Sequence, residues 1–130
     1  MANKKALDYY KDNRPNKIIL RHSGCLMETL ATTALVRDIH KYYGGLFHID
    51  VRTPHPEIWE NNPRIRKLDG RSATLIDLKF NRDQFTNSYQ THFMGMFHDQ
   101  FNDVMGLDVR LSEAKADIHI SDYESSLLGD

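Results

Sequence analysis

The segment that joins a short apolar run to a helical pattern carries most of the side chains suited to chemistry. It reads His22, Ser23, Gly24, Cys25, Leu26, Met27 and Glu28. Glu28 is a carboxylate that can accept a proton from a hydroxyl group within hydrogen-bond reach. Backbone amides at a helix start can hold an anion, and Gly24 allows a ligand to approach the chain closely. We therefore predict a binding loop with Glu28 as candidate base, although the helix dipole alone also favours an acid at this position.

Other chemistries have weaker support in the sequence. Cys25 before a helix, with His22 nearby, would suit a small cysteine hydrolase, but a lone loop cysteine is more often a small packing residue. The seven histidines contain no H-x-x-x-H pair, and His92 and His98 are six residues apart, so we expect no metal. The sequence also has no G-x-G-x-x-G and no Walker A lysine, so we expect no nucleotide cofactor.

The elements that must position this loop follow from apolar spacing. A compact apolar run bounded by turn formers predicts a strand at 17–21, and three- and four-residue spacing predicts helices at 28–42 and 91–105. On the first helix the polar side is expected to include Arg37 and Asp38. Further strands are expected at 46–51, 65–68, 74–80 and 116–121, short helices at 5–12 and 57–61, and a loop at 81–90. This order predicts an α/β fold, a single Rossmann-like domain with a mostly parallel sheet flanked by helices.

Composition sets the broad class of the protein. The chain has 130 residues, 40% of them hydrophobic and 27% charged, which suits one globular domain. Seventeen basic and eighteen acidic residues argue against a nucleic-acid binder, which would be strongly basic. We expect a polar extension at 1–16, the domain at 17–122 and a linker or tail at 123–130. The single cysteine, and the lack of a signal-like or membrane-spanning run, predict a cytoplasmic protein with at most peripheral contact at the inner membrane surface.

Residues 17–37 carry a resemblance to a known family. They are similar to the opening of glycosyltransferase family 9, the lipopolysaccharide heptosyltransferases, which begin with a strand, a Gly-Leu-Gly-Asp-type loop and a helix with a Thr-Thr-Pro-like step. Four later segments also resemble that family. Residues 48–54 resemble its second strand, and residues 56–63 the Asn-Pro segment that follows it. Residues 92–106 and 117–121 resemble the last helix and the exit strand of that domain. The resemblance therefore covers roughly residues 17–122.

The resemblance implies the N-terminal, acceptor-side half of a GT-B fold. The implied reaction is inverting transfer of a sugar from a nucleotide-activated heptose to a lipopolysaccharide-type acceptor, without metal or cofactor. Glu28 would be the catalytic base. The acceptor cleft would be lined by His22, Ser23, Gly24, Cys25, Leu26, Met27, Arg52 and Thr53. Arg21, Arg52 and Arg64 would lie near strand ends, where they either hold acceptor phosphates or are simply solvated.

The loop and the length of the chain depart from the family pattern. Met27 replaces a second glycine, Glu28 replaces aspartate and Ala34 replaces proline. The longer glutamate moves the carboxylate by about an ångström, a displacement that can cost about a hundredfold in rate. The donor-binding half would lie outside these residues, so we expect the chain alone neither to bind ADP-heptose well nor to transfer sugar. It would work with a separate donor-binding chain, or as a stand-alone remnant that binds a glycan or protein and covers its apolar surface as a homodimer.

Overall fold

Three parallel strands form the sheet that organises the domain. The computed structural model describes residues 16–79, 93–113 and 115–117. Strand β1 (Lys17–Arg21) is central, with β2 (His48–Arg52) on one side and β3 (Thr74–Asp77) on the other, so the order is β2-β1-β3. Both pairings are parallel. The structure is thus an α/β arrangement consistent with a small Rossmann-like domain, as the sequence predicted.

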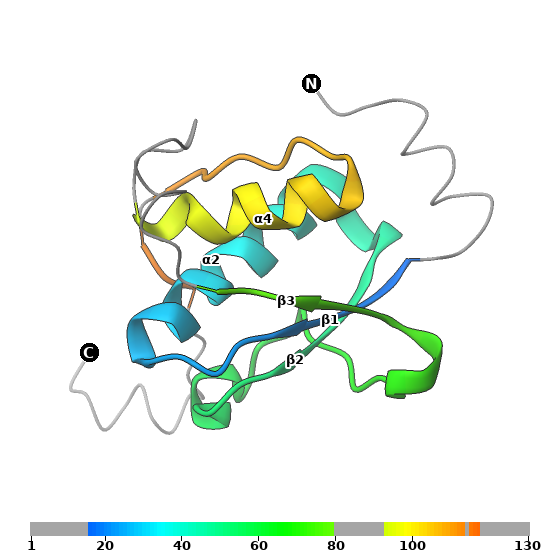
Figure 1. The fold of residues 1–130 in the computed structure, drawn as a ribbon, viewed down its shortest axis with the longest axis horizontal. Coiled ribbons are helices and arrows are strands. Elements are labelled where there is room, and N and C mark those ends of the chain that lie inside the picture. Colours follow the sequence, from blue (N-terminus) through cyan, green and yellow to red (C-terminus); the bar gives the residue numbers. More distant parts are fainter. Residues whose placement is uncertain (1–15, 80–92, 114, 118–130) are drawn as a thin grey trace.

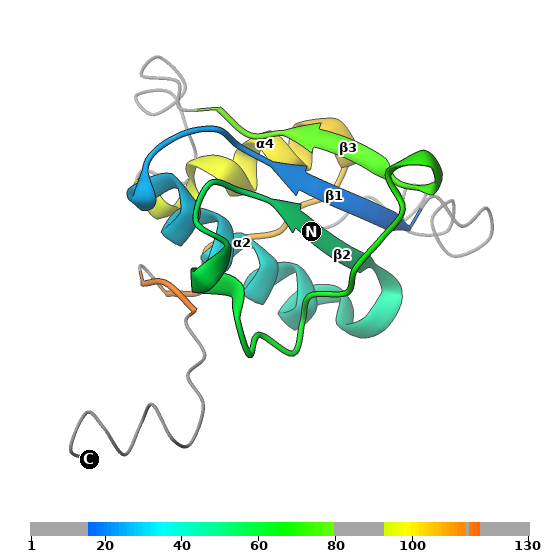
Figure 2. The ribbon, with the colours of Figure 1, turned by 90° about the horizontal axis from the view of Figure 1, so that it is seen from below.

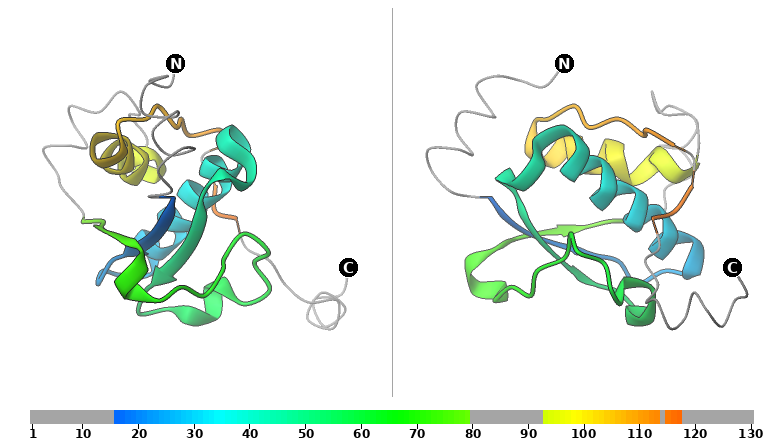
Figure 3. Two further views of the ribbon diagram at one scale, coloured as in Figure 1. Left: turned by 90° about the vertical axis from the view of Figure 1, so that its right-hand side faces the viewer. Right: turned by 180° about the vertical axis from the view of Figure 1, so that it is seen from behind.

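Two α-helices pack against one face of this sheet. Helix α2 (Leu26–Tyr43) follows β1 and helix α4 (Met96–Met105) follows β3, and both lie on the same side (Figures 1 and 3). Viewed from the opposite face, the strands lie in front of both helices (Figure 2). No helix in the described part of the chain is long and apolar enough to cross a membrane.

The core lies between the sheet and these helices. Ile18 and Leu20 of β1 are completely buried there, because alternate strand residues point to the same face. Phe97 and Phe101 are likewise buried on α4, which confirms the apolar stripe predicted for this helix. Val104, on the same helix, is 58% exposed.

A buried polar cluster joins α2, α4 and the segment after α4. Asp38 and His98 are both fully buried, and His98 Nε2 lies 2.8 Å from Asp38 Oδ2. Ser112 donates from both its amide and its hydroxyl to the same carboxylate, and Arg37 adds two further bonds. The expectation that Asp38 lies on the polar side of the helix is therefore wrong. The neighbouring Arg37 and two partners from distant parts of the chain, His98 and Ser112, compensate its burial, and sequence periodicity does not reveal the distant ones.

Residues 65–68 do not form the strand that the sequence predicted. Among the described residues they contribute one parallel bridge, between Ile65 and Ile49. The amide of Leu68 donates to Oδ2 of Asp50 at 2.9 Å. Because a side-chain carboxylate takes the place of a main-chain carbonyl acceptor, the ladder does not continue beyond Ile65.

Other boundaries differ from expectation by short distances. The short helix predicted at 57–61 is a 3-10 turn, Pro56–Trp59. Strand β3 ends at Asp77, and α4 begins at Met96 after a 3-10 turn, Phe93–Gly95, with Gly95 as its N-cap. Predictions for 1–15, 80–92 and 118–130 lie outside the described residues, including the first short helix, the loop at 81–90, the tail and most of the last strand. Ala116 and Asp117, which are described, are not in a strand.

Candidate functional site

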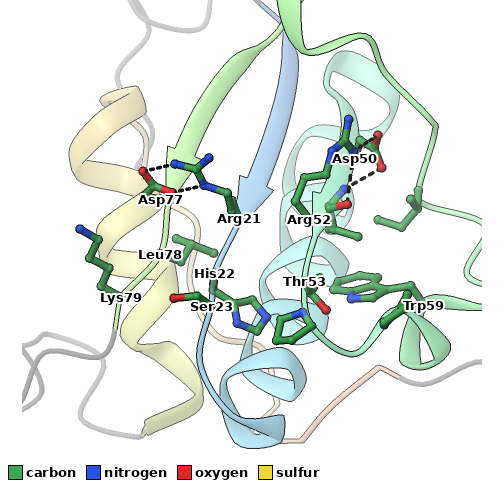
Figure 4. Close-up of a pocket in the computed structure, with 14 residues that line it drawn as sticks. Arg21, His22, Ser23, Asp50, Arg52, Thr53, Trp59, Asp77, Leu78 and Lys79 are labelled. Carbon is green, nitrogen blue, oxygen red and sulfur yellow. Dashed lines mark hydrogen bonds and ion pairs between the residues drawn. The ribbon is translucent and has the colours of Figure 1, made fainter.

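A cleft of about 930 Å³ opens at the carboxyl ends of all three strands (Figure 4). Strand order reverses at β1, because β2 and β3 pair with its opposite edges, and ligands of open α/β sheets bind beyond the strand ends at such a point. The volume lies within the range of ligand pockets, roughly 300–1,000 Å³. The lining residues are Arg21, His22, Ser23, Asp50, Val51, Arg52, Thr53, Pro54, Pro56, Trp59, Ile65, Asp77, Leu78 and Lys79.

On one side of the cleft, Arg21 and Asp77 form a two-pronged ion pair across β1 and β3 (Figure 4). The Nε and Nη2 atoms of Arg21 lie 2.6 and 2.9 Å from the two carboxylate oxygens. The hydrogen bond from Arg21 and its charge lower the pKa of Asp77, and the same bond raises the pKa of Arg21. Both side chains are about half exposed, and the pairing leaves Nη1 of Arg21 for a ligand.

On the other side, Asp50 fixes Arg52 at the end of β2 (Figure 4). Arg52 Nη1 lies 2.5 Å from Asp50 Oδ2, and Nη2 donates to the carbonyl of Leu68 at 3.1 Å. Burial would raise the pKa of Asp50, but hydrogen bonds from Arg52 and from the Leu68 and Val51 amides lower it overall. Asp50 therefore stays ionised and orients the guanidinium of Arg52, whose side chain is 45% exposed.

The cleft combines this charged rim with an apolar wall. Trp59 and Ile65, together with two prolines, come from the chain that runs from β2 to β3 along the β2 edge (Figure 2). Trp59 is 7% exposed, so only a small part of its ring reaches the cleft. Three cationic side chains and two carboxylates line the cleft, a small positive excess. Such a site can offer hydrogen-bond donors, acceptors and an apolar face to one ligand.

His22 forms the floor between the two sides. Its amide donates to the carbonyl of Arg52 at 3.2 Å, which joins the first residue after β1 to the end of β2. The ring is buried beside Phe97, with ring centroids 6.3 Å apart. Burial, and then the charge of His55, lower the pKa of His22, so the ring is neutral near pH 7.

No family model, curated protein or solved structure matches this chain. Among the described residues, no three His, Cys, Asp or Glu side chains are grouped as metal ligands would be.

The structure brings together four of the residues predicted to bind substrate. His22, Ser23, Arg52 and Thr53 all line the cleft, although they come from two different strand ends. The other predicted binding residues, which are not among the lining residues, are Gly24, Cys25, Leu26 and Met27. Cys25, Leu26 and Met27 are exposed.

Glu28, the predicted base, lies next to the cleft floor and is not among its lining residues. Its carboxylate lies against Gly24 and 3.9 Å from Nδ1 of His22, and 15% of the side chain is exposed. Arg64, expected either to hold an acceptor phosphate or to be solvated, pairs with Asp117 at 2.7 Å and is also not a lining residue.

Sequence reasoning missed several lining residues, above all Asp50, Asp77 and Trp59. Asp77 faces Arg21 only because β1 and β3 pair in a particular register, Arg21 opposite Asp77. The sequence pattern places Asp50 in a predicted strand and Trp59 in the segment after it, without a role in binding for either. A signal was available for Asp50, which interrupts an apolar run close to the end of a predicted strand, where ligands of parallel sheets bind. Asp77 lies in the middle of the strand predicted at 74–80, and only the structure ends that strand at Asp77.

Proposed function

We propose that this chain is the acceptor-side domain of a heptosyltransferase-like glycosyltransferase, and that its cleft binds a sugar-containing acceptor. The observation that carries the proposal is the cleft at the carboxyl ends of three parallel strands, where Arg21 and Arg52 are each oriented by a carboxylate. The resemblance of residues 17–122 to glycosyltransferase family 9 supports the same assignment. The donor half would be supplied by another segment or chain.

The chemistry of the lining suits a carbohydrate. Sugar hydroxyls both donate and accept hydrogen bonds, and the cleft offers guanidinium donors beside carboxylate acceptors. Sugar rings also have apolar faces, which can pack against the exposed rings of Pro54 and Pro56 in the cleft wall. Guanidinium groups bind phosphates bidentately, so a phosphorylated sugar fits as well as a neutral one.

In the proposed reaction, the acceptor hydroxyl gives its proton to a Glu28 oxygen as the acceptor oxygen bonds to the anomeric carbon of the activated sugar. The bond from that carbon to the diphosphate oxygen breaks, and its electron pair leaves with the nucleotide diphosphate. Glu28 reaches the acceptor from beside the cleft floor, so acceptor binding must bring the hydroxyl to the Gly24 side of His22.

Binding is tested by titrating the chain with a deacylated, phosphorylated lipopolysaccharide core oligosaccharide and with its dephosphorylated form. Replacing Arg52 by alanine is expected to weaken binding by about 10-fold or more, because a hydrogen bond to a charged group contributes about 1.5–3 kcal/mol. Arg71→Ala is the matched control, since Arg71 is exposed and not a lining residue. Equal affinities in the two variants, or no binding by the wild type, would refute the proposal.

A binding domain without chemistry is the second candidate. The observation that favours it is the position of Glu28, which is not one of the lining residues. The two candidates differ in an assay that supplies ADP-heptose and a donor-binding half. Transfer that is lost in Glu28→Gln, with oligosaccharide affinity unchanged, supports the enzyme, whereas binding without any transfer supports the second candidate.

A further inference from the structure

The ring of His22 has an unusual set of neighbours. Its side chain is completely buried, and Nε2 lies 3.1 Å from the hydroxyl of Thr29. Nδ1 is buried and makes no hydrogen bond with any described residue. Oε2 of Glu28 lies 3.9 Å from Nδ1. Buried polar atoms are nearly always paired, so this one requires an explanation.

The Glu28 carboxylate is held in place from its other side by the main chain. A Cβ atom added to Gly24 would lie 1.6 Å from Oε2 and 2.0 Å from Cδ of Glu28. The carboxylate therefore occupies the space that any other side chain at position 24 would fill. Glycine at this position and histidine at position 22 together confine the end of the Glu28 side chain.

The tautomer of His22 follows from these contacts. A neutral imidazole has one N–H donor and one acceptor nitrogen. If the hydrogen were on Nε2, the lone pair of Nδ1 would face a carboxylate oxygen, and two acceptors would repel each other. With the hydrogen on Nδ1, a donor faces the carboxylate and the Thr29 hydroxyl donates to Nε2. Thr29 is free for this role, since Thr32 and Thr33 donate their hydroxyls to helix carbonyls and Thr29 does not.

We propose that His22 is a positioning residue that carries its hydrogen on Nδ1 and directs it at Oε2 of Glu28. The hydrogen bond requires the Glu28 carboxylate to move toward the ring, because the present 3.9 Å separation is beyond hydrogen-bond length. Thr29, His22 and Glu28 then form a chain of hydrogen bonds that leaves Oε1 of Glu28 for the acceptor hydroxyl. The catalytic meaning of this chain rests on the proposed function, in which Glu28 is the base.

The tautomer is measured on the whole chain by ¹⁵N NMR of the histidine side chains, without any ligand. The expected result is a protonated Nδ1 and an unprotonated Nε2 in His22 at pH 7. Glu28→Gln should move the Nδ1 resonance of His22. Glu60→Gln is the matched control, because Glu60 is exposed and its loss should leave His22 unchanged. A hydrogen on Nε2 of His22 in the wild type would overturn the inference.

Two substitutions of His22 separate positioning from packing. The amide nitrogen of asparagine falls near the position of Nδ1, and that of glutamine near Nε2. The Cδ resonance of Glu28 is therefore expected to shift in His22→Gln and to return toward the wild-type position in His22→Asn. Equal shifts in two folded variants would mean that His22 only fills space, and would contradict the proposal.

These results are separable from those that test the proposed function. A hydrogen on Nε2 combined with Arg52-dependent oligosaccharide binding overturns the role of His22 alone. A hydrogen on Nδ1 with no oligosaccharide binding supports the hydrogen-bond chain and refutes the proposed function.

Discussion

Asp38 stabilises the domain by joining three separate parts of the chain. Five hydrogen bonds end on its two carboxylate oxygens, from His98 on α4, from Ser112 beyond α4 and from the neighbouring Arg37. Arg37 also donates to the carbonyls of Glu113 and Lys115, at 2.9 and 2.7 Å. The cluster thus holds the segment after α4 against α2.

Replacing Asp38 by asparagine is expected to lower the free energy of unfolding by about 3 kcal/mol. Removing one partner of a buried ion pair costs roughly 3–5 kcal/mol. Asparagine keeps the shape and one acceptor oxygen, which places the expected loss at the lower end of that range. Its NH₂ group would face donors of His98, Arg37 or Ser112. A loss of this size is a large part of the roughly 5–15 kcal/mol that stabilises a typical domain.

The contribution of Asp38 also depends on pH in a defined direction. Burial alone would raise its pKa, but the hydrogen bonds from His98, Arg37 and Ser112 outweigh burial and hold the pKa well below its ordinary value. The folded-state pKa is therefore lower than the unfolded one, about 3.9. The stabilisation is complete above that value and is lost as pH falls toward the folded-state pKa. The wild type and Asp38→Asn should therefore differ least in acid.

Chemical denaturation between pH 3 and pH 7 measures both effects. Asp103→Asn is the control, because Asp103 is exposed on α4. If Asp38→Asn does not fold, Ser112→Ala is the milder variant and should cost about 1.5–3 kcal/mol, as expected for a hydrogen bond to a charged group. Surface substitutions scatter by roughly 0.5 kcal/mol. The role of Asp38 is refuted if the free energy of unfolding of Asp38→Asn lies within that range of the control. It is also refuted if the difference between the wild type and Asp38→Asn does not change with pH.

Two further substitutions test the packing of α4. Phe97→Ala should cost about 3–5 kcal/mol in denaturant unfolding, because the ring is completely buried, whereas Val104→Ala on the same helix should have little effect. Equal losses would contradict the assigned core face. Asn102→Ala should cost about 1–3 kcal/mol, since its side chain bonds both the amide and the carbonyl of Val109 at 2.8 Å. Thermal unfolding of Asn102→Ala is compared with that of the control Asp103→Ala. Equal stabilities of the two variants would show that the turn after α4 does not depend on Asn102.

The fold was predictable where the pattern of the chain is local. The apolar run at 17–21 and the three- and four-residue spacing after it predicted β1 and most of α2, because strand and helix periodicities depend on neighbouring residues. The strand predicted at 65–68 does not form, because the carboxylate of Asp50 accepts the hydrogen bond from the Leu68 amide. Prediction also failed at Asp38, whose burial depends on His98, sixty residues away.

The candidate site was predicted in part for the same reason. The position of the loop after the first strand predicts His22 and Ser23 as cleft residues, the family resemblance implies Arg52 and Thr53, and all four line the cleft. Whether Glu28 acts as a base stays a prediction, since the structure places it beside the cleft floor and does not test its chemistry.

The sequence by itself determined the class of the domain and the loop after its first strand, because alternation, spacing and turn residues are properties of neighbouring positions. Only the tertiary structure decided which charges meet. The pairing of Arg21 with Asp77 depends on strand register, and the contact of His22 with Glu28 depends on how the loop folds over Gly24. Such contacts join side chains through space, and their energies depend on distance and burial, which residue order alone does not specify.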